Sequence, residues 1–207
     1  IYVDYDEKNR TVTIADNGIG MDRDDIINNI GTIARSGTKE FLTKLSGDEA
    51  KDAHLIGQFG VGFYSSFIIA DEVTLESRKA GTKQGFKWQS KGDGEFTLES
   101  VAREERGTKI TLYLKKDEDE FLDSWRLKEI IKKYSDHITL PIVMKKTDFK
   151  DGNTVKTNED EVINDASAIW TRNKKDIKAK EYEEFYKSLT FDTEPPLAHF
   201  HNRVEGT

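Results

Sequence analysis

Two glycine-rich segments contain the residues of this sequence that are best suited to form a binding site. The first, Asp16–Met21, ends a run in which apolar and polar residues alternate, and the second, Gly57–Gly62, leads into a mostly apolar run. A glycine-rich turn at the start of a helix exposes backbone N–H groups and the positive end of the helix dipole, which favours phosphate. A carboxylate fixed at the end of a strand can accept a hydrogen bond from an exocyclic amine, which adenine has and guanine lacks at that position.

Each segment also has a simpler interpretation. Asp16-Asn17-Gly18 is typical of a turn, and the glycines of the second segment could serve a loop that needs positive φ angles. Neither the GxxxxGK[ST] nor the GxGxxG signature of common nucleotide-binding proteins is present in the expected context. The two segments together, in this order, become specific for an adenine nucleotide only through the resemblance to a known family that is described below.

The composition narrows the classes of function. The 207 residues include 39 Asp and Glu against 32 Lys and Arg, a net charge of -7 that argues against a nucleic-acid partner. The sequence has no cysteine, which excludes disulfides and thiolate chemistry. No apolar stretch approaches the ~18 residues of a membrane helix, so no membrane partner is expected. His199 and His201 are spaced as metal ligands can be, but no third ligand is apparent and no metal site is predicted.

The elements that must position the glycine segments can be read from periodicity. A hairpin is expected over 1–6 and 10–15, a helix over 22–30, and a short helix from Thr38. Four further strands are expected to form an antiparallel meander, at 72–78, 85–89, 95–101 and 108–114. A helix over 118–134, with Trp125 among its inward residues, and a strand over 142–146 follow.

The order of these elements predicts an α+β fold, a two-layer sandwich with a mostly antiparallel sheet covered on one face by helices. We expect a nucleotide-binding domain over 1–146, a polar linker over 147–160, and the start of a second domain over 161–207 with a helix at 180–189. The chain begins in mid-pattern without Met and ends without a natural stop, so both domains are expected to be truncated.

The sequence resembles the heat-shock protein 90 chaperones, most of all their bacterial type. The similarity covers the whole chain and is carried by Asp16–Met21, 25–38, Ile56–Tyr64, Arg106–Thr108, Trp170–Asn173 and 202–206. The wider group, with type II topoisomerases, mismatch-repair ATPases and histidine kinases, shares only the two glycine segments. The resemblance implies a Bergerat-type ATP-binding fold.

The resemblance also implies roles for individual residues. Asp16 would recognise adenine, Gly20 and Met21 would form the platform of the base, Asn29 would face ribose and the α-phosphate, and Thr108 would support Asp16. Arg35 stands where relatives have Lys, and Ser36 follows it. The phosphate loop would comprise Gly57, Gly60, Val61, Gly62 and Phe63. Residues 31–56 would form a lid over the nucleotide.

What the family needs for hydrolysis is expected outside this chain. The general-base Glu and an Asn that binds Mg²⁺ would precede Ile1, and an Arg that reaches the γ-phosphate would follow Thr207. No catalytic or metal-binding residue is therefore assigned here. By the same resemblance, the intact protein would be a cytoplasmic, homodimeric ATPase that uses ATP, ADP and Mg²⁺ and acts on unfolded or partly folded client proteins.

Two alternatives remain open on the residues alone. One is another ATPase of the same fold, a histidine kinase or a topoisomerase; the net charge of -7 argues against the DNA-binding surface of the latter. The other is a nucleotide-binding or interaction module without hydrolysis. A helix with Glu and Asn four residues apart, upstream of Ile1, would distinguish the ATPase from the module.

Overall fold

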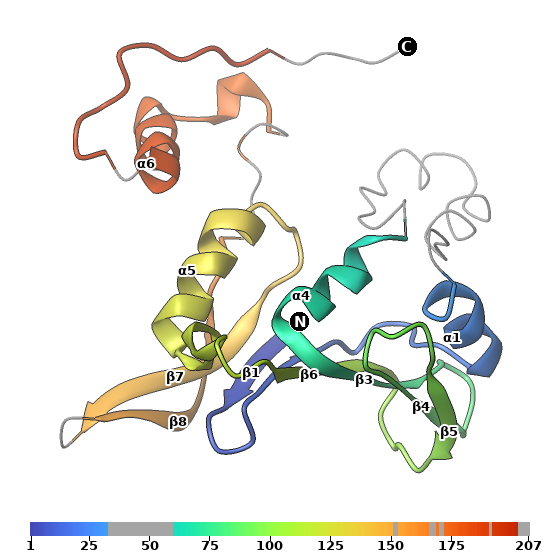
Figure 1. Ribbon diagram of the computed structural model, residues 1–207. Coiled ribbons are helices and arrows are strands. Elements are labelled where there is room, and N and C mark those ends of the chain that lie inside the picture. Colours follow the sequence, from blue (N-terminus) through green and yellow to red (C-terminus); the bar gives the residue numbers. More distant parts are fainter. Residues whose placement is uncertain (33–59, 151–152, 166–168, 170–171, 191, 203–207) are drawn as a thin grey trace, which may run out of the picture. The chain divides into compact units, whose positions relative to one another are not determined.

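The computed structural model describes residues 1–32, 60–150, 153–165, 169, 172–190 and 192–202 (Figure 1). The predicted helix from Thr38 lies outside these residues. The chain divides into two compact units, Ile1–Asp123 and Ser124–Thr207, which are described separately.

The first unit is built on six strands. They are β1 (Tyr2–Asp6), β2 (Thr11–Ala15), β3 (Ala70–Arg78), β4 (Gly85–Ser90), β5 (Thr97–Val101) and β6 (Gly107–Leu114). Their order in the sheet is β5-β4-β3-β6-β2-β1, and each pair of neighbours is antiparallel. The hairpin and the four later strands predicted from the sequence are confirmed as elements.

The predicted meander is wrong for its last strand. Instead of pairing with β5, β6 returns to the other side of β3 and lies between β3 and β2. The burial of the two strands explains the order: Leu112 and Leu114 of β6 are buried, as a central strand requires, whereas Thr97, Glu99 and Ser100 of β5 are exposed and suit an edge. The crossover brings the start of β6 beside the end of β2.

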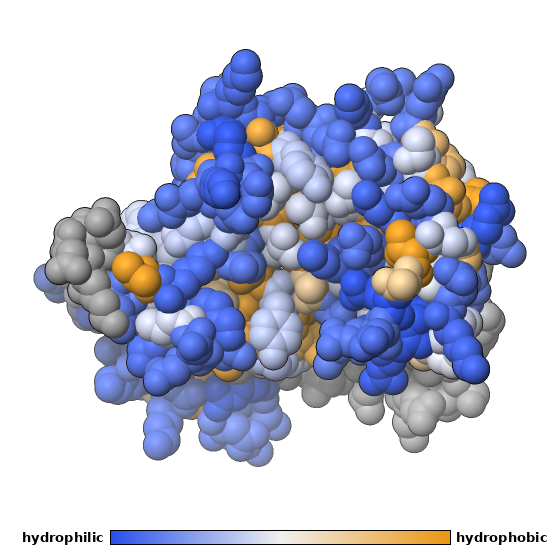
Figure 2. Space-filling view, turned by 90° about the horizontal axis from the view of Figure 1, so that it is seen from below, coloured by the Kyte–Doolittle hydropathy of each residue, from blue (hydrophilic) through white to orange (hydrophobic). Residues whose placement is uncertain are grey.

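The two faces of this sheet differ in chemistry. Helices α1 (Arg23–Asn29) and α4 (Ser66–Ile69) lie on one side of it (Figure 1), and that face carries the core side chains Val12, Val73, Leu75, Trp88 and Leu112. The opposite face carries a threonine row in which Thr111 lies between Thr13 and Thr74. Seen from below in Figure 2, this side is largely hydrophilic or intermediate in colour. The α+β class, with helices on one face of a mostly antiparallel sheet, is confirmed.

The predicted helix over 118–134 is interrupted. A short 3₁₀ helix, η2 (Asp119–Leu122), ends at Asp123, whose backbone is extended. The second unit then begins with α5 (Ser124–Ser135), in which Leu127 and Ile131 are buried. The inward position predicted for Trp125 is wrong, because its side chain is 71% exposed.

The rest of the second unit contains a hairpin of β7 (Val143–Lys150) and β8 (Asn153–Val162), then η4 (Lys174–Asp176) and α6 (Ala179–Thr190). Residues 147–150 and 153–160 are thus strands and not loop-like as expected, while their assignment to a linker between domains stays a prediction. Ion pairs between the two strands, Lys145–Asp160 at 2.6 Å and Lys146–Glu159 at 3.2 Å, favour a polar hairpin that has no apolar alternation to reveal it. The predicted helix over 180–189 is confirmed by α6.

Helix α1 begins with a reciprocal cap. The Asp22 side chain accepts the Asp25 N–H at 3.0 Å, and the Asp25 side chain accepts the Asp22 N–H at 3.1 Å. Lys79, just after β3, has its ammonium group 2.7 Å from a carboxylate oxygen of each. The Lys79 bond is the main cause that lowers the pKa of Asp22, and the two carboxylates raise the pKa of Lys79. The cluster fixes the start of α1 against the end of β3.

Removing the charge of Asp22 should destabilise the fold in a pH-dependent way. Asp22→Asn retains an oxygen for the cap but loses the ion pair, so we expect unfolding to become easier by about 0.5–1 kcal/mol at neutral pH. Because the pKa of Asp22 is lower in the folded chain than its ordinary 3.8, its contribution is present above that value and is lost as the pH falls through the folded value. The free energies of unfolding of parent and variant, measured with urea, should therefore converge below about pH 4. A difference that persists unchanged at lower pH would contradict this account.

Candidate nucleotide site

A row of three polar side chains crosses the sheet at the end of its apolar face. Asp16 directly follows β2 and pairs with Thr108 of β6 through two backbone bonds, Asp16 N–H to Thr108 O at 2.8 Å and Thr108 N–H to Asp16 O at 3.3 Å. Thr108 in turn pairs with Ser77 of β3. Residues directly opposite on antiparallel strands project from the same face. The carboxylate and the two hydroxyls therefore stand side by side.

The hydroxyl of Ser77 connects this row to the first glycine segment. It accepts the N–H of Met21 at 2.8 Å and lies 3.0 Å from both the carbonyl oxygen of Gly107 and the hydroxyl of Thr108. Ser77 is fully buried and Thr108 is 9% exposed. The sequence analysis did not identify Ser77, because its place opposite Thr108 follows from the strand pairing alone.

Two glycines allow the loop over 16–21 to lie against the strand ends. Gly20 has φ +67°, and a Cβ there would meet the carbonyl oxygen of Arg78 at 2.0 Å. Gly107 has φ +104°, and a Cβ there would meet the carbonyl oxygen of Asp16 at 2.1 Å. The Ala80 N–H also bonds to the carbonyl of Ile19 at 2.7 Å. The backbone therefore sets the position of Asp16.

The carboxylate of Asp16 is oriented by its own turn. Its Oδ1 accepts the N–H of Gly18 at 2.8 Å, the geometry of an Asx turn. The residue is exposed, so its carboxylate is open to a ligand. Ile14, the last residue before it on the same face of β2, keeps 38% of its surface exposed. A hydrogen-bond acceptor thus lies beside apolar surface, as the edge and face of a purine require.

The second glycine segment leads into a short helical stretch. Described from Gly60 onward, it leads into η1 (Gly62–Ser65) and then the single turn of α4. Because the helix is so short, its dipole is small. Only the backbone N–H groups of its first turn are available to bind phosphate. Val61 is 53% exposed, and a Cβ on Gly62 would meet no atom within 4 Å, so the backbone here is accessible.

Two contacts hold this segment to the rest of the unit. The ring of Phe63 packs edge-on against Trp88 with centroids 5.5 Å apart. The hydroxyl of Tyr64 donates to the carbonyl of Ile30 at 2.7 Å, and burial raises the pKa of Tyr64. Ile30 directly follows Asn29, the last residue of α1, so the second segment lies close to the end of that helix.

The structure thus brings the predicted residues into two groups. Asp16, Gly20, Met21 and Thr108 surround the polar row, with Ser77 added. Gly60, Val61, Gly62 and Phe63 lie near Asn29 at the end of α1. Arg35, Ser36, Gly57 and almost all of the predicted lid lie outside the described residues. The assignment of nucleotide contacts to these residues stays a prediction.

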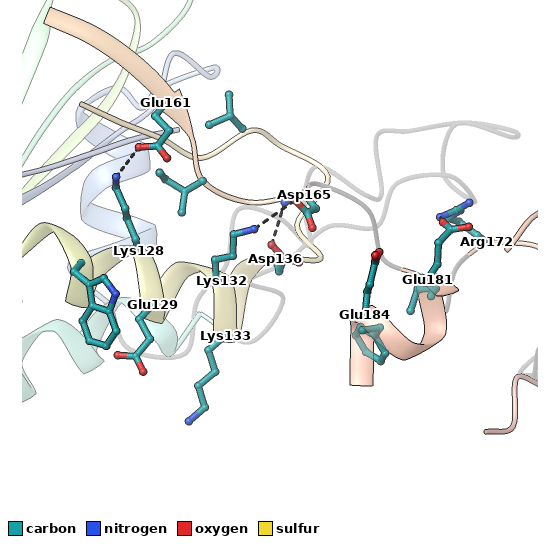
Figure 3. Close-up of a pocket in the computed structure, with 15 residues that line it drawn as sticks. Lys128, Glu129, Lys132, Lys133, Asp136, Glu161, Asp165, Arg172, Glu181 and Glu184 are labelled. Carbon is teal, nitrogen blue, oxygen red and sulfur yellow. Dashed lines mark hydrogen bonds and ion pairs between the residues drawn. The ribbon is translucent and has the colours of Figure 1, made fainter. Parts of the chain in front are cut away.

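A cavity in the second unit is lined mainly by charged side chains. It measures about 680 Å³ and is lined by α5, the end of β8 and α6 (Figure 3). Several of its charges are paired, among them Lys128 with Glu161 at 2.5 Å and Arg172 with Glu181 at 2.6 Å. Such pairs compensate one another, and this cavity contains none of the predicted nucleotide-binding residues. We therefore place the candidate site in the first unit.

The two histidines with metal-like spacing have aromatic partners. His199 stacks on Tyr182 with centroids 4.1 Å apart, and a ring nitrogen of His201 lies 2.7 Å from the Tyr182 hydroxyl. Across the part of the chain that the structure describes, no three His, Asp or Glu residues gather as a metal site would require. Among the same residues, no helix combines the length and apolar character needed to traverse a bilayer.

Comparison with known proteins shows which families the chain is similar to. Residues 1–157 match the family described as histidine kinase-, DNA gyrase B-, and HSP90-like ATPase, and residues 145–207 match the family described as Hsp90 protein. The chain is 60% identical to the chaperone protein HtpG of Dechloromonas aromatica over 208 aligned residues, and 59% identical to that of Nitrosospira multiformis over 211.

Both alignments cover 100% of the chain and 33% of the relative, so the chain spans about a third of the length of these curated relatives. The protein of the same name from Chromobacterium violaceum is 58% identical, with the same coverage. The two family matches together extend over the whole chain. The chain therefore belongs to the histidine kinase-, DNA gyrase B- and HSP90-like ATPases, and over 145–207 it is similar to the Hsp90 proteins.

Proposed function

We propose that the chain binds ATP and ADP and forms the nucleotide-binding part of an ATP-dependent molecular chaperone. The row of Asp16, Thr108 and Ser77 is the observation that carries this proposal, because it places hydrogen-bond acceptors beside an exposed apolar side chain. In this proposal Asp16 accepts a hydrogen bond from the 6-amino group of adenine, and Gly20 and Met21 lie along the base.

The phosphates extend from this row toward the second glycine segment. Gly57, Gly60, Val61, Gly62 and Phe63 form the phosphate loop, where N–H groups at the start of a helix suit phosphate oxygens. Asn29 faces the ribose and the α-phosphate, and Arg35 and Ser36 complete the contacts from the predicted lid. The contact between Tyr64 and Ile30 supports this arrangement, because it ties the phosphate loop to the end of α1.

The whole protein is proposed to hydrolyse ATP with Mg²⁺, to act as a homodimer in the cytoplasm, and to assist the folding of client proteins. The general base, the metal ligand and the cation for the γ-phosphate are expected from other parts of that protein. The Hsp90 match over 145–207 supports a chaperone rather than a kinase or a topoisomerase, and supports residues 161–207 as the start of a second domain.

Calorimetric titration of the full-length gene product tests the proposal. ADP should bind with a stoichiometry of one per chain, GDP should bind far more weakly, and ATP should be hydrolysed slowly in the presence of Mg²⁺. GDP is the control, because it carries the same sugar and phosphates but has a 6-oxo group in place of the 6-amino group, together with an N1–H and a 2-amino group. Equal affinity for ADP and GDP, or no affinity for either, would overturn the proposal.

A further inference from the structure

Ser77 has no assigned role, yet it occupies the centre of the polar contacts behind Asp16. It projects from β3 on the same face as Thr108, and no part of its side chain reaches the surface. A residue this deeply buried does not touch a ligand. Its effect on the site must therefore pass through its partners, and the following argument rests on the proposed function.

The three partners of Ser77 fix the direction of each hydrogen bond. A serine hydroxyl has one proton to donate and two lone pairs to accept with. The Met21 N–H takes one lone pair, and the Gly107 carbonyl, which cannot donate, takes the proton. Only the second lone pair is left for Thr108, so the Thr108 hydroxyl must donate to Ser77 across the 3.0 Å between them. This assignment satisfies all three contacts.

A hydroxyl that has given its proton inward can offer only lone pairs outward. Thr108 therefore acts as an acceptor toward the site, directly beside the Asp16 carboxylate, which is an acceptor as well. Two adjacent acceptors suit an amine, directly or through a bridging water, since an amine carries two protons. A carbonyl in the same place would face two acceptors and lose its hydrogen bond with water without replacement.

We propose that Ser77 is a positioning residue that holds the Thr108 hydroxyl as a hydrogen-bond acceptor, and so helps the site to select purines with an amino group at position 6. Asp16 supplies the charged part of this selection. Ser77 supplies a second part by denying Thr108 the option of turning its proton toward a carbonyl. The substitution Ser77→Ala would restore that option.

The preference for ADP over inosine diphosphate measures this effect. The two nucleotides are alike in sugar and phosphates and differ at one edge of the base, where inosine diphosphate has a 6-oxo group and an N1–H in place of the 6-amino group and the unprotonated N1 of ADP. In the full-length protein, Ser77→Ala should lower the ratio of the two affinities about fivefold, the equivalent of one neutral hydrogen bond. Ser77→Thr, which keeps the hydroxyl, should retain the parental ratio. A loss of packing alone would weaken both nucleotides alike and leave the ratio unchanged.

Two further variants keep the test decisive. In Ser77→Cys the side chain has nearly the size of serine but forms only weak hydrogen bonds. This variant replaces Ser77→Ala if circular dichroism shows Ser77→Ala to be unfolded. Adding Ser77→Ala to Thr108→Val should not change the ratio, because no hydroxyl remains to turn. A parent that prefers ADP, with an unchanged ratio in the Ser77 variants, overturns this inference alone. A parent that does not bind ADP overturns the proposed function with it.

Discussion

Replacing Asp16 by asparagine should weaken ADP binding about 100-fold. The carboxylate is proposed to accept a hydrogen bond from the amino group of adenine. A hydrogen bond to a charged group contributes about 1.5–3 kcal/mol. The asparagine amide also places an N–H donor opposite the amino group, which is itself a donor, and this adds to the loss. The change is otherwise small, because an asparagine oxygen can still accept the Gly18 N–H that holds the turn. Isothermal titration of the full-length protein with ADP measures the loss.

Asp24→Asn is the matched control for this variant. Asp24 lies in the first turn of α1 and is exposed, so the same chemical change is made on the same unit outside the polar row. ADP affinity should stay within about twofold of the parent for such a surface substitution. If Asp16→Asn also bound ADP like the parent, Asp16 would not be the residue that recognises adenine.

The second large effect is expected at Gly20. Alanine there would adopt φ +67° and would place its Cβ 2.0 Å from the Arg78 carbonyl oxygen, where only backbone can move. The positive φ costs about 1–2 kcal/mol, and displacement of the loop adds to it, so the free energy of unfolding should fall by about 3 kcal/mol. Urea unfolding followed by circular dichroism measures the loss, and ADP binding should weaken with it because the loop carries Asp16.

Gly81 separates the two contributions. It has a similar φ of +80°, but a Cβ there would meet no atom within 4 Å. Gly81→Ala should therefore show the cost of the positive φ alone, about 1–2 kcal/mol. Equal destabilisation by the two variants would mean that the close approach at Gly20 is relieved without cost.

The sequence was sufficient where structure is set by near neighbours. The alternation around the first hairpin, and the acidic start of α1 with its apolar spacing, predicted elements that the structure confirms. Asp22 and Asp25 show why: both partners of the cap lie within one turn. The two glycine segments likewise pointed to a nucleotide because their residue types limit the backbone locally.

The sequence was insufficient where the structure depends on contacts between segments that are far apart in the chain. The place of β6 between β3 and β2 depends on which strand buries more of its surface, and the alternation within each strand does not reveal that. The β7–β8 hairpin is polar, and Lys145 and Asp160 become partners only through its register. Ser77 was missed for the same reason, since nothing near it in the chain marks it as a neighbour of Thr108.

The central position of β6 has a consequence for biosynthesis. Asp16 emerges from the ribosome early, but its partner strand is the last of the six to be made, and pairing over such sequence separations is slow. A nascent chain should therefore not bind nucleotide until translation has passed Leu114. In the proposed function, ATP would from that moment bind the finished domain and draw the remaining unfolded population toward it.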